Sequence, residues 1–175
     1  MRIIDRRGQL TRRTVLRGSM LAVPGVAASM AISPDAAWAQ AAANLKPATM
    51  VTLAQVARDI YPHDRLADAH YIAAIAGYDA AAPAVRDMLE KGCDALDAEA
   101  MKRHASSYIA VPGEVDRVAI LTSQEATPFF GKLRSDLVVS LYNQKSLWAK
   151  FGYEGASADK GGYIHRGFDD IDWLS

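Results

Sequence analysis

The chain has 175 residues, of which 50% are hydrophobic, 23% charged and 8% aromatic, and its formal net charge at pH 7 is zero. This composition is typical of a globular protein of one domain and excludes a disordered chain. The single cysteine excludes a disulfide scaffold, and 12 glycines without a period exclude a collagen-like chain. Residues 1–39 hold six arginines and two acids, whereas residues 40–175 hold 14 basic and 18 acidic residues. We expect no nucleic-acid partner, because such a partner requires a basic face.

The first 39 residues have the three regions of a bacterial export signal. An arginine-rich start is followed by an apolar stretch of about 15 residues at 18–32 and then by the small-x-small tripeptide Ala37-Trp38-Ala39. The apolar stretch is shorter than the roughly 20 residues that a membrane span needs. We therefore expect cleavage after Ala39 and a mature chain of residues 40–175. The alternative is a basic leader that is not cleaved.

A twin-arginine motif lies within this leader. Residues 11–17, Thr-Arg-Arg-Thr-Val-Leu-Arg, resemble the usual form Ser/Thr-Arg-Arg-x-Phe-Leu-Lys, with Val15 in place of Phe and Arg17 in place of Lys. The expected signal residues are Arg12, Arg13 and Leu16. The twin-arginine translocase moves folded proteins, often because a cofactor must be inserted before export. We therefore expect the chain in the periplasm or at its membrane surface, either binding a cofactor or travelling with a protein that does.

The first half of the mature chain predicts three helices. Thr52 is expected to cap the first one, which has apolar residues at i, i+3, i+4 and i+7 and ends before Pro62. Asp68 is expected to cap the second helix, and Pro83 suits the first turn of the third, where a missing N–H is harmless. Cys93 lies on the apolar stripe of this third helix, where it is either a core residue or the source of an intermolecular disulfide. The other expected members of the stripe are Val85, Met88, Leu89, Leu96, Met101, Ala105 and Tyr108.

The second half predicts two further helices after a turn at 111–113. The inward positions expected in the first of these are Val115, Val118, Ala119 and Thr122. Thr127 and Pro128 are expected to cap and open the next helix. Its expected inward positions are Phe130, Leu133, Leu137 and Leu141. Ser146 is expected to cap a final short turn. Since no strand-like alternation or internal repeat occurs, we predict an all-α bundle of about five helices over residues 40–151.

Residues 152–175 have no helical or strand period, and they combine five glycines with four aromatic rings. Glycine lets the backbone approach another surface closely, and aromatic rings provide large contact areas. We expect an irregular arm that binds a partner protein; the alternative is an arm folded over its own bundle. The expected partner-binding residues are Trp148, Tyr153, Gly155, Gly161, Gly162, Tyr163, Arg166, Phe168 and Trp173.

The sequence offers little chemistry of its own. It has no Gly-x-Ser-x-Gly, no Gly-x-Gly-x-x-Gly after a strand and no Cys-x-x-Cys-His. The loop from His63 to His70, with Asp64 and Asp68, is the one hint of a metal site; a solvated loop is the other interpretation. We expect no catalytic residue, metal or cofactor in this chain. Export through the twin-arginine route then favours a signal-bearing subunit that carries a catalytic partner without a signal.

Several segments resemble the gluconate 2-dehydrogenase subunit 3 family. They are Tyr-Pro-His-Asp at 61–64 with Asp68 and Tyr71, Leu-Tyr-Asn at 141–143, Trp148, Gly-Tyr-Glu-Gly at 152–155 and the block 161–174. The resemblance covers most of the mature chain, and the C-terminal block is its most specific part. It implies the small, non-catalytic subunit of a periplasmic, membrane-associated sugar dehydrogenase, serving export, maturation and stability. The implied partner is a large FAD-containing flavoprotein of the glucose–methanol–choline class. A cytochrome c subunit commonly completes such complexes, and the resemblance leaves open whether one is present here.

The resemblance leaves the substrate open, because family members accompany different sugar, sugar-acid and glucoside dehydrogenases. Two other functional classes also stay open at this point. One is a free-standing periplasmic helical binding module, and the other is an enzyme or metal protein that uses the loop from His63 to His70.

Overall fold

The computed structural model describes residues 37–165, which belong to one compact unit of the chain and contain six α-helices and no strand. The α-helices are α2 (Pro47–Ile60), α3 (Asp68–Ile75), α4 (Pro83–His104), α5 (Glu114–Thr122), α6 (Pro128–Ser140) and α7 (Lys145–Trp148). The 3₁₀ turns are η1 (Ala37–Ala41), η2 (Ala76–Ala80), η3 (Tyr108–Ala110), η4 (Ala149–Phe151) and η5 (Ser157–Lys160). The predicted all-α class is confirmed for this part of the chain.

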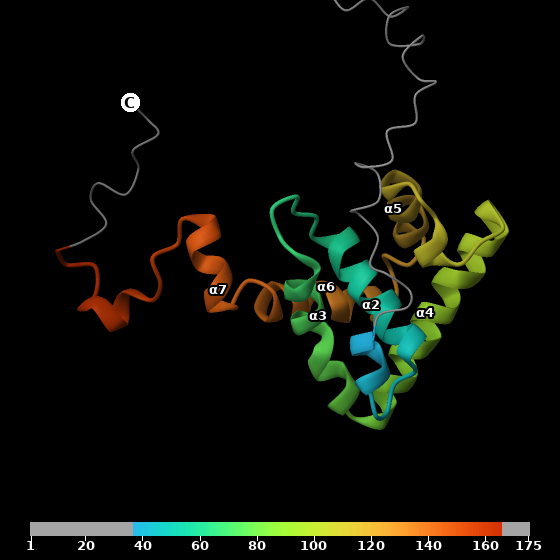
Figure 1. Ribbon diagram of the computed structural model, residues 1–175, viewed down its shortest axis with the longest axis horizontal. Helices are drawn as coiled ribbons and strands as arrows, with labels where there is room; N and C mark the ends of the chain where they lie inside the picture. Colours follow the sequence, from blue (N-terminus) through green and yellow to red (C-terminus); the bar gives the residue numbers. More distant parts are fainter. Residues whose placement is uncertain (1–36, 166–175) are drawn as a thin grey trace, which may run out of the picture. The chain divides into compact units, whose positions relative to one another are not determined.

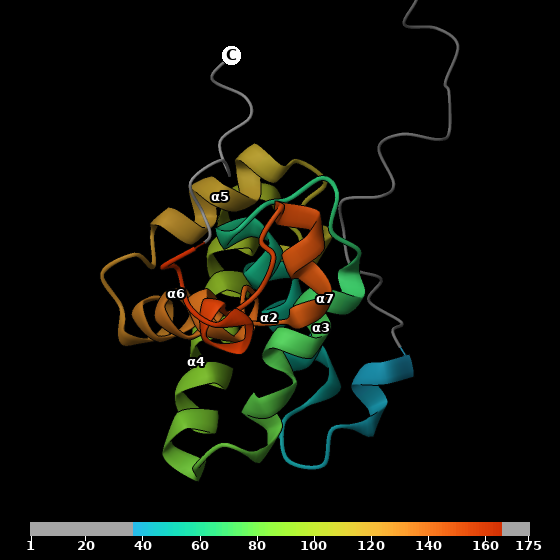
Figure 2. The same cartoon turned by 90° about the vertical axis from the view of Figure 1, so that its left-hand side faces the viewer.

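Helix α2 is the centre of the bundle, and every residue from Thr49 to Asp59 is buried. It contacts α3, α4, α5 and α6, as Figures 1 and 2 show from two directions. The helix begins at Pro47, whose fixed φ and missing N–H suit a first turn, and it ends before Pro62 as predicted. The prediction that Thr52 is the N-cap was wrong, because Thr52 lies inside the helix and is 4% exposed.

Helices α3 and α4 follow the predicted pattern with two differences. Ala67, not Asp68, is the N-cap of α3, and Asp68 is the first helical residue. Pro83 opens α4 as expected, and the core interpretation of Cys93 is confirmed, since it is 4% exposed and burial raises the pKa of its thiol. The stripe does not continue as predicted, because Met101 is 57% exposed and the helix ends at His104, before Ala105 and Tyr108.

Helix α5 presents a different face to the core from the one predicted. Arg117 is fully buried and pairs with Asp59 of α2 through Nε–Oδ2 at 2.9 Å and Nη2–Oδ1 at 3.0 Å. Its Nη1 also donates to the carbonyl of Val111 at 2.9 Å, and the Tyr108 hydroxyl donates to Asp59 at 2.7 Å. Because this buried pair fixes the rotation of α5, Val115 points outward and is 82% exposed. The residues that replace the predicted inward set are Arg117, Ile120 and Leu121.

Helix α6 begins as predicted, with the Thr127 hydroxyl accepting a hydrogen bond from the Phe130 amide at 3.3 Å. Phe129 is buried where the sequence predicted Phe130. The remaining predicted positions Leu133, Leu137 and Leu141 are all buried. The short helix α7 starts after Gln144, and the expected cap Ser146 lies inside it. None of the helices within residues 37–165 is long and apolar enough to span a membrane.

Candidate functional site

An aromatic cluster forms where the loop after α2 meets the segment after α6. The rings of Tyr61 and His63 lie edge-on to Tyr142, with centroids 5.7 and 5.6 Å away, and His63 Nε2 is 2.7 Å from the Tyr142 hydroxyl. Phe151 closes the cluster, with its centroid 5.3 Å from His63 and 5.7 Å from Tyr142. Two segments that carry the family resemblance, 61–64 and 141–143, are therefore neighbours in space.

Three side chains hold the loop after α2 in place. Arg58 donates to the Asp68 carboxylate at 2.6 Å and lies over the Tyr71 ring, 5.2 Å from its centroid. The Tyr71 hydroxyl in turn donates to the carbonyl of Tyr61 at 2.8 Å. Asp68 and Tyr71 thus support the aromatic cluster: Asp68 supplies a carboxylate for Arg58, and Tyr71 supplies a ring for Arg58 and a hydroxyl donor for Tyr61.

Trp148 connects the cluster to the start of the C-terminal arm. Its indole Nε1 donates to the carbonyl of Tyr142 at 3.1 Å, and its own carbonyl accepts from the Tyr153 amide at 2.8 Å. The rings of Trp148 and Tyr153 are T-shaped with centroids 5.1 Å apart. Gly155 has a φ of +101°, and a Cβ there would lie 3.4 Å from the Trp148 ring, so glycine suits this position on both grounds.

A shallow apolar depression of about 500 Å³ lies beside this junction. Its lining residues, which we call the α6–arm surface, are Val138, Val139, Tyr142, Asn143, Trp148, Phe151 and Tyr153. Val138 is 52% exposed, Val139 63%, and Phe151 and Tyr153 each 46%. A contiguous patch of exposed apolar side chains often marks a protein interaction site, whereas a single exposed apolar residue does not.

Two lysines flank the α6–arm surface. The ammonium group of Lys145 lies 5.9 Å from the centroid of the Trp148 ring. Lys150 Nζ lies 3.4 Å from Nε2 of His70, beside Phe151. A partner that covers this surface without an electrostatic penalty must present acidic or neutral groups to these two cations.

Three further predicted arm residues, Gly161, Gly162 and Tyr163, lie in open surroundings. Gly161 and Gly162 have φ of +85° and +82°, and a Cβ at either position would have no atom within 4 Å. The Gly162 amide donates to the carbonyl of Ser157 at 2.8 Å, which ends the turn η5. Tyr163 is 61% exposed. Within the described part of the arm, Tyr153 and Gly155 are thus brought to Trp148, whereas these three residues are not.

Six of the predicted functional residues lie outside the described part of the chain, three in the leader and three in the arm. They are Arg12, Arg13 and Leu16 of the export signal and Arg166, Phe168 and Trp173 of the arm. The predicted cleavage residues Ala37 and Ala39 are described, and both lie in η1, where Ala39 is 1% exposed.

The histidines of the loop have separate partners. His63 contacts Tyr142, whereas His70 Nδ1 lies 3.2 Å from the side-chain oxygen of Gln144. Gln144 also donates to the carbonyl of His70 at 2.8 Å, so this pair ties α3 to the end of α6. Residues 37–165 contain no group of three or more side chains placed to hold a metal ion.

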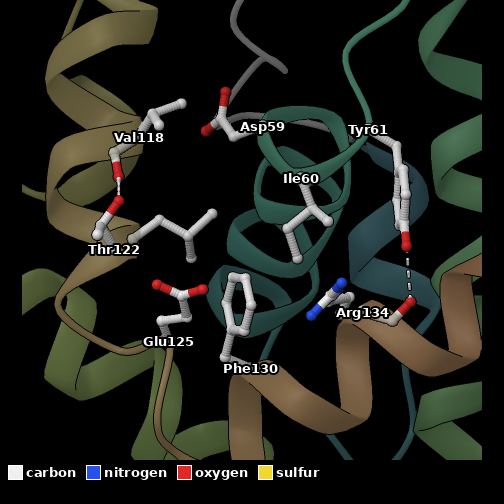
Figure 3. A pocket seen from close by; sticks show the side chains of 9 residues that line it. Asp59, Ile60, Tyr61, Val118, Thr122, Glu125, Phe130 and Arg134 are labelled. Atoms are coloured by element: carbon white, nitrogen blue, oxygen red, sulfur yellow. Dashed lines mark hydrogen bonds between the residues drawn. The ribbon is translucent and has the colours of Figure 1, made fainter.

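A second cavity, of about 320 Å³, opens between α2, α5 and α6 (Figure 3). Ile60, Leu121 and Phe130 contribute its apolar walls. Figure 3 shows the Phe130 ring between the carboxylate of Glu125 and the guanidinium of Arg134. Two acids, Asp59 and Glu125, and one base, Arg134, line the cavity. The Asp59 carboxylate is bound by Arg117 and Tyr108, so it is not available as the partner of Glu125 in acid–base catalysis.

The valines of the α6–arm surface were not among the residues predicted from sequence. Leu133, Leu137 and Leu141 form the inward stripe of α6 at intervals of four, so the adjacent Val138 and Val139 fall on the outer face. Two consecutive β-branched apolar residues on the outer face of a helix are the signal that would have identified this surface.

Searches against protein-family models, curated proteins and solved structures give no match for this chain. The resemblance described above therefore stays a prediction from the residues that carry it.

Proposed function

We propose that this chain is the non-catalytic small subunit of an exported sugar or glucoside dehydrogenase. The large subunit is a flavoprotein of the glucose–methanol–choline class that binds FAD and has no export signal. The small subunit carries it through the twin-arginine translocase and remains bound in the periplasm, where it stabilises the flavoprotein. A cytochrome c subunit completes the complex at the membrane and accepts the electrons.

The α6–arm surface is the observation that carries this proposal. It exposes Val138, Val139, Phe151 and Tyr153 together, which is unfavourable for a subunit that works alone in water. Three of the segments that carry the family resemblance, 61–64, 141–143 and 152–155, meet beside it around Tyr142 and Trp148. One surface thus joins the residues of the resemblance to the start of the arm.

The chemistry of the surface indicates what its partner contributes. Interfaces gain most of their binding energy from a few aromatic and aliphatic anchors that become buried. Phe151 and Tyr153 are such anchors, because each is half exposed and held on one side by another ring. The partner surface is apolar at its centre and acidic or neutral opposite Lys145 and Lys150.

Capture of the full chain from its own organism tests the proposal. A tagged chain purified from the periplasmic fraction is expected to bring with it a larger yellow protein that has a flavin absorbance spectrum and reduces a dye in the presence of a sugar. A chain that elutes alone, or that itself reduces the dye, contradicts the proposal.

A matched pair of double variants locates the interface. Val138→Gln with Val139→Gln is expected to lower the amount of captured flavoprotein at least about tenfold, since two polar amides would be buried without partners in an apolar interface. Val115→Gln with Val118→Gln changes exposed valines of α5, which are 82% and 39% exposed, and is expected to leave capture unchanged. Loss of capture in the α5 pair alone contradicts the assignment of the α6–arm surface.

A further inference from the structure

The bond that follows the predicted cleavage sequence lies in a packed part of the molecule. Ala37–Ala41 form η1, which contacts α2 and is drawn in blue in Figure 1. Ala39 is 1% exposed, Trp38 packs against the core, and the Ala42 amide donates to the carbonyl of Ala39 at 3.2 Å. The predicted scissile bond, between Ala39 and Gln40, is therefore inside a turn, where Ala39 is buried and Ala37 and Gln40 are exposed.

The residues immediately after this turn are fixed by one carboxylate. Asp79 of η2 accepts hydrogen bonds from three consecutive backbone amides, those of Ala43 at 3.0 Å, Asn44 at 2.9 Å and Leu45 at 2.8 Å. The amides of Ala43, Leu45 and Asn44 lower the pKa of Asp79 to about 2, so the carboxylate is charged at neutral pH. Leu45 is 3% exposed and inserts its side chain into the core.

A second contact supports the same segment. Lys46 forms an ion pair with Glu90 of α4 at 2.8 Å, and its amide donates to the same carboxylate at 3.2 Å. Residues 37–46 are thus joined to α2, to η2 and to α4. Proteolysis favours exposed and flexible backbone, whereas this bond follows a buried side chain in a segment that these contacts hold against the bundle.

We infer that residues 37–45 act as a conformational gate on removal of the leader: in the folded domain the bond between Ala39 and Gln40 is protected, and it is cut only from molecules in which η1 and the Asp79 contact have opened. The inference rests on the proposed function, because that function supplies the export signal. The twin-arginine translocase delivers a folded chain, so the signal peptidase meets the closed gate. Removal of the leader is then set by the population of the open form.

Cleavage of the purified full chain by signal peptidase in detergent tests the gate. Mass spectrometry measures how fast a chain beginning at Gln40 appears, beside a free peptide of residues 30–50. The peptide is expected to be cut at least about tenfold faster than the folded chain, which corresponds to an opening free energy of about 1.4 kcal/mol. Equal rates overturn the gate, and so does a peptide that is not cut after Ala39, because the cleavage site is then elsewhere.

Substitution of the carboxylate identifies the contact that holds the gate. Asp79→Ala is expected to raise the cleavage rate of the folded chain several-fold, with Asp79→Asn intermediate, because the amide side chain keeps one acceptor but loses the charge. Asp87→Ala is the matched control: this exposed acid on α4 pairs with Lys91 and touches no residue of the gate. Circular dichroism shows whether each variant is folded, and hydrogen exchange of the Leu45 amide reports opening directly.

The outcomes separate this inference from the proposed function. Fast cleavage of a wild-type chain that still captures the flavoprotein overturns the gate alone. Slow cleavage of a chain that captures nothing overturns the proposed function alone. If the folded Asp79→Ala variant is cleaved as slowly as the Asp87→Ala control, Asp79 does not hold the gate.

Discussion

Replacing Gly92 with alanine tests the closest approach between α4 and α6. Gly92 lies in the middle of α4, where glycine is ordinarily less favourable than alanine by about 1 kcal/mol. In this molecule a Cβ at Gly92 would overlap the ring of Phe129, because it would lie far closer than van der Waals distance to Cγ, Cδ2 and Cε2, the last at 2.6 Å. Phe129 is 3% exposed, so its ring has no solvent space into which to move.

The two effects have opposite signs, and their magnitudes decide the outcome. Helix propensity favours Gly92→Ala by about 1 kcal/mol, whereas forcing extra volume into a packed core typically costs about 1–3 kcal/mol and sometimes more. Because three ring atoms are involved, we expect the upper part of that range and a net loss of about 2 kcal/mol in the free energy of unfolding. Gly131→Ala in α6 is the matched control, since a Cβ there has no atom within 4 Å, and we expect a gain of about 0.5–1 kcal/mol.

Urea unfolding of the full chain measures both changes. With a denaturant slope of about 1–3 kcal/mol per molar, Gly92→Ala should move the midpoint down by roughly 1 M and Gly131→Ala should move it slightly up. The double variant Gly92→Ala with Phe129→Leu should recover part of the loss, because the smaller side chain leaves room for the methyl group. If Gly92→Ala unfolds at or above the wild-type midpoint, the packing of α4 on α6 described here is wrong.

Three further predictions concern the core, the gate and the arm. Arg117→Leu should lower the free energy of unfolding by about 3–5 kcal/mol in urea titrations, because it leaves the buried Asp59 carboxylate without its charge partner; a loss below about 1 kcal/mol contradicts this. The folded-state pKa of Asp79, about 2, lies below its ordinary 3.8, so the contact is fully formed above pH 4 and weakens as the pH falls towards 2. Hydrogen exchange of the Leu45 amide should accelerate over that range relative to its intrinsic rate, and Asp79→Asn should remove the pH dependence; an unchanged profile contradicts the contact. Deleting residues 161–175 should abolish capture of the flavoprotein with near-normal thermal unfolding, whereas a lower melting temperature with retained capture supports an arm folded on its own bundle.

The parts of the fold that depend on local chemistry were predictable from sequence. Thr127 caps α6 and Pro128 occupies its first turn. Pro83 occupies the first turn of α4, and α2 ends before Pro62. The stripes around Cys93 and Leu137 also follow from helical periodicity alone.

The errors arose where a distant partner overrides a local preference. Val115 and Val118 look like an inward stripe, but Arg117 turns α5 toward Asp59, which is 58 residues away in the chain. Burying an arginine is favourable only when such a partner exists, and periodicity does not reveal the partner. Pro47 similarly starts α2 one turn before Thr52, since tertiary burial of the helix supports the extra residues.

In the candidate site, too, some features follow from local sequence and others from tertiary packing. The sequence singled out Trp148, Tyr153 and Gly155 as partner-binding residues, and the structure brings these three together. Their contact with Tyr142, and the exposure of Val138 beside them, depend on how α7 packs against the end of α6. That packing is a tertiary property without a local motif, so the full surface could not be assembled from sequence patterns.

The cellular location of the flavoprotein shows whether the small subunit carries it across the membrane. In the organism that makes this chain, Arg12→Lys with Arg13→Lys should block export of the small subunit and leave the sugar-dependent dye-reducing activity in the cytoplasmic fraction. The wild-type chain should place that activity in the periplasm or at its membrane. If the flavoprotein reaches the periplasm fully active in the double variant, the small subunit is not its carrier and the account is wrong.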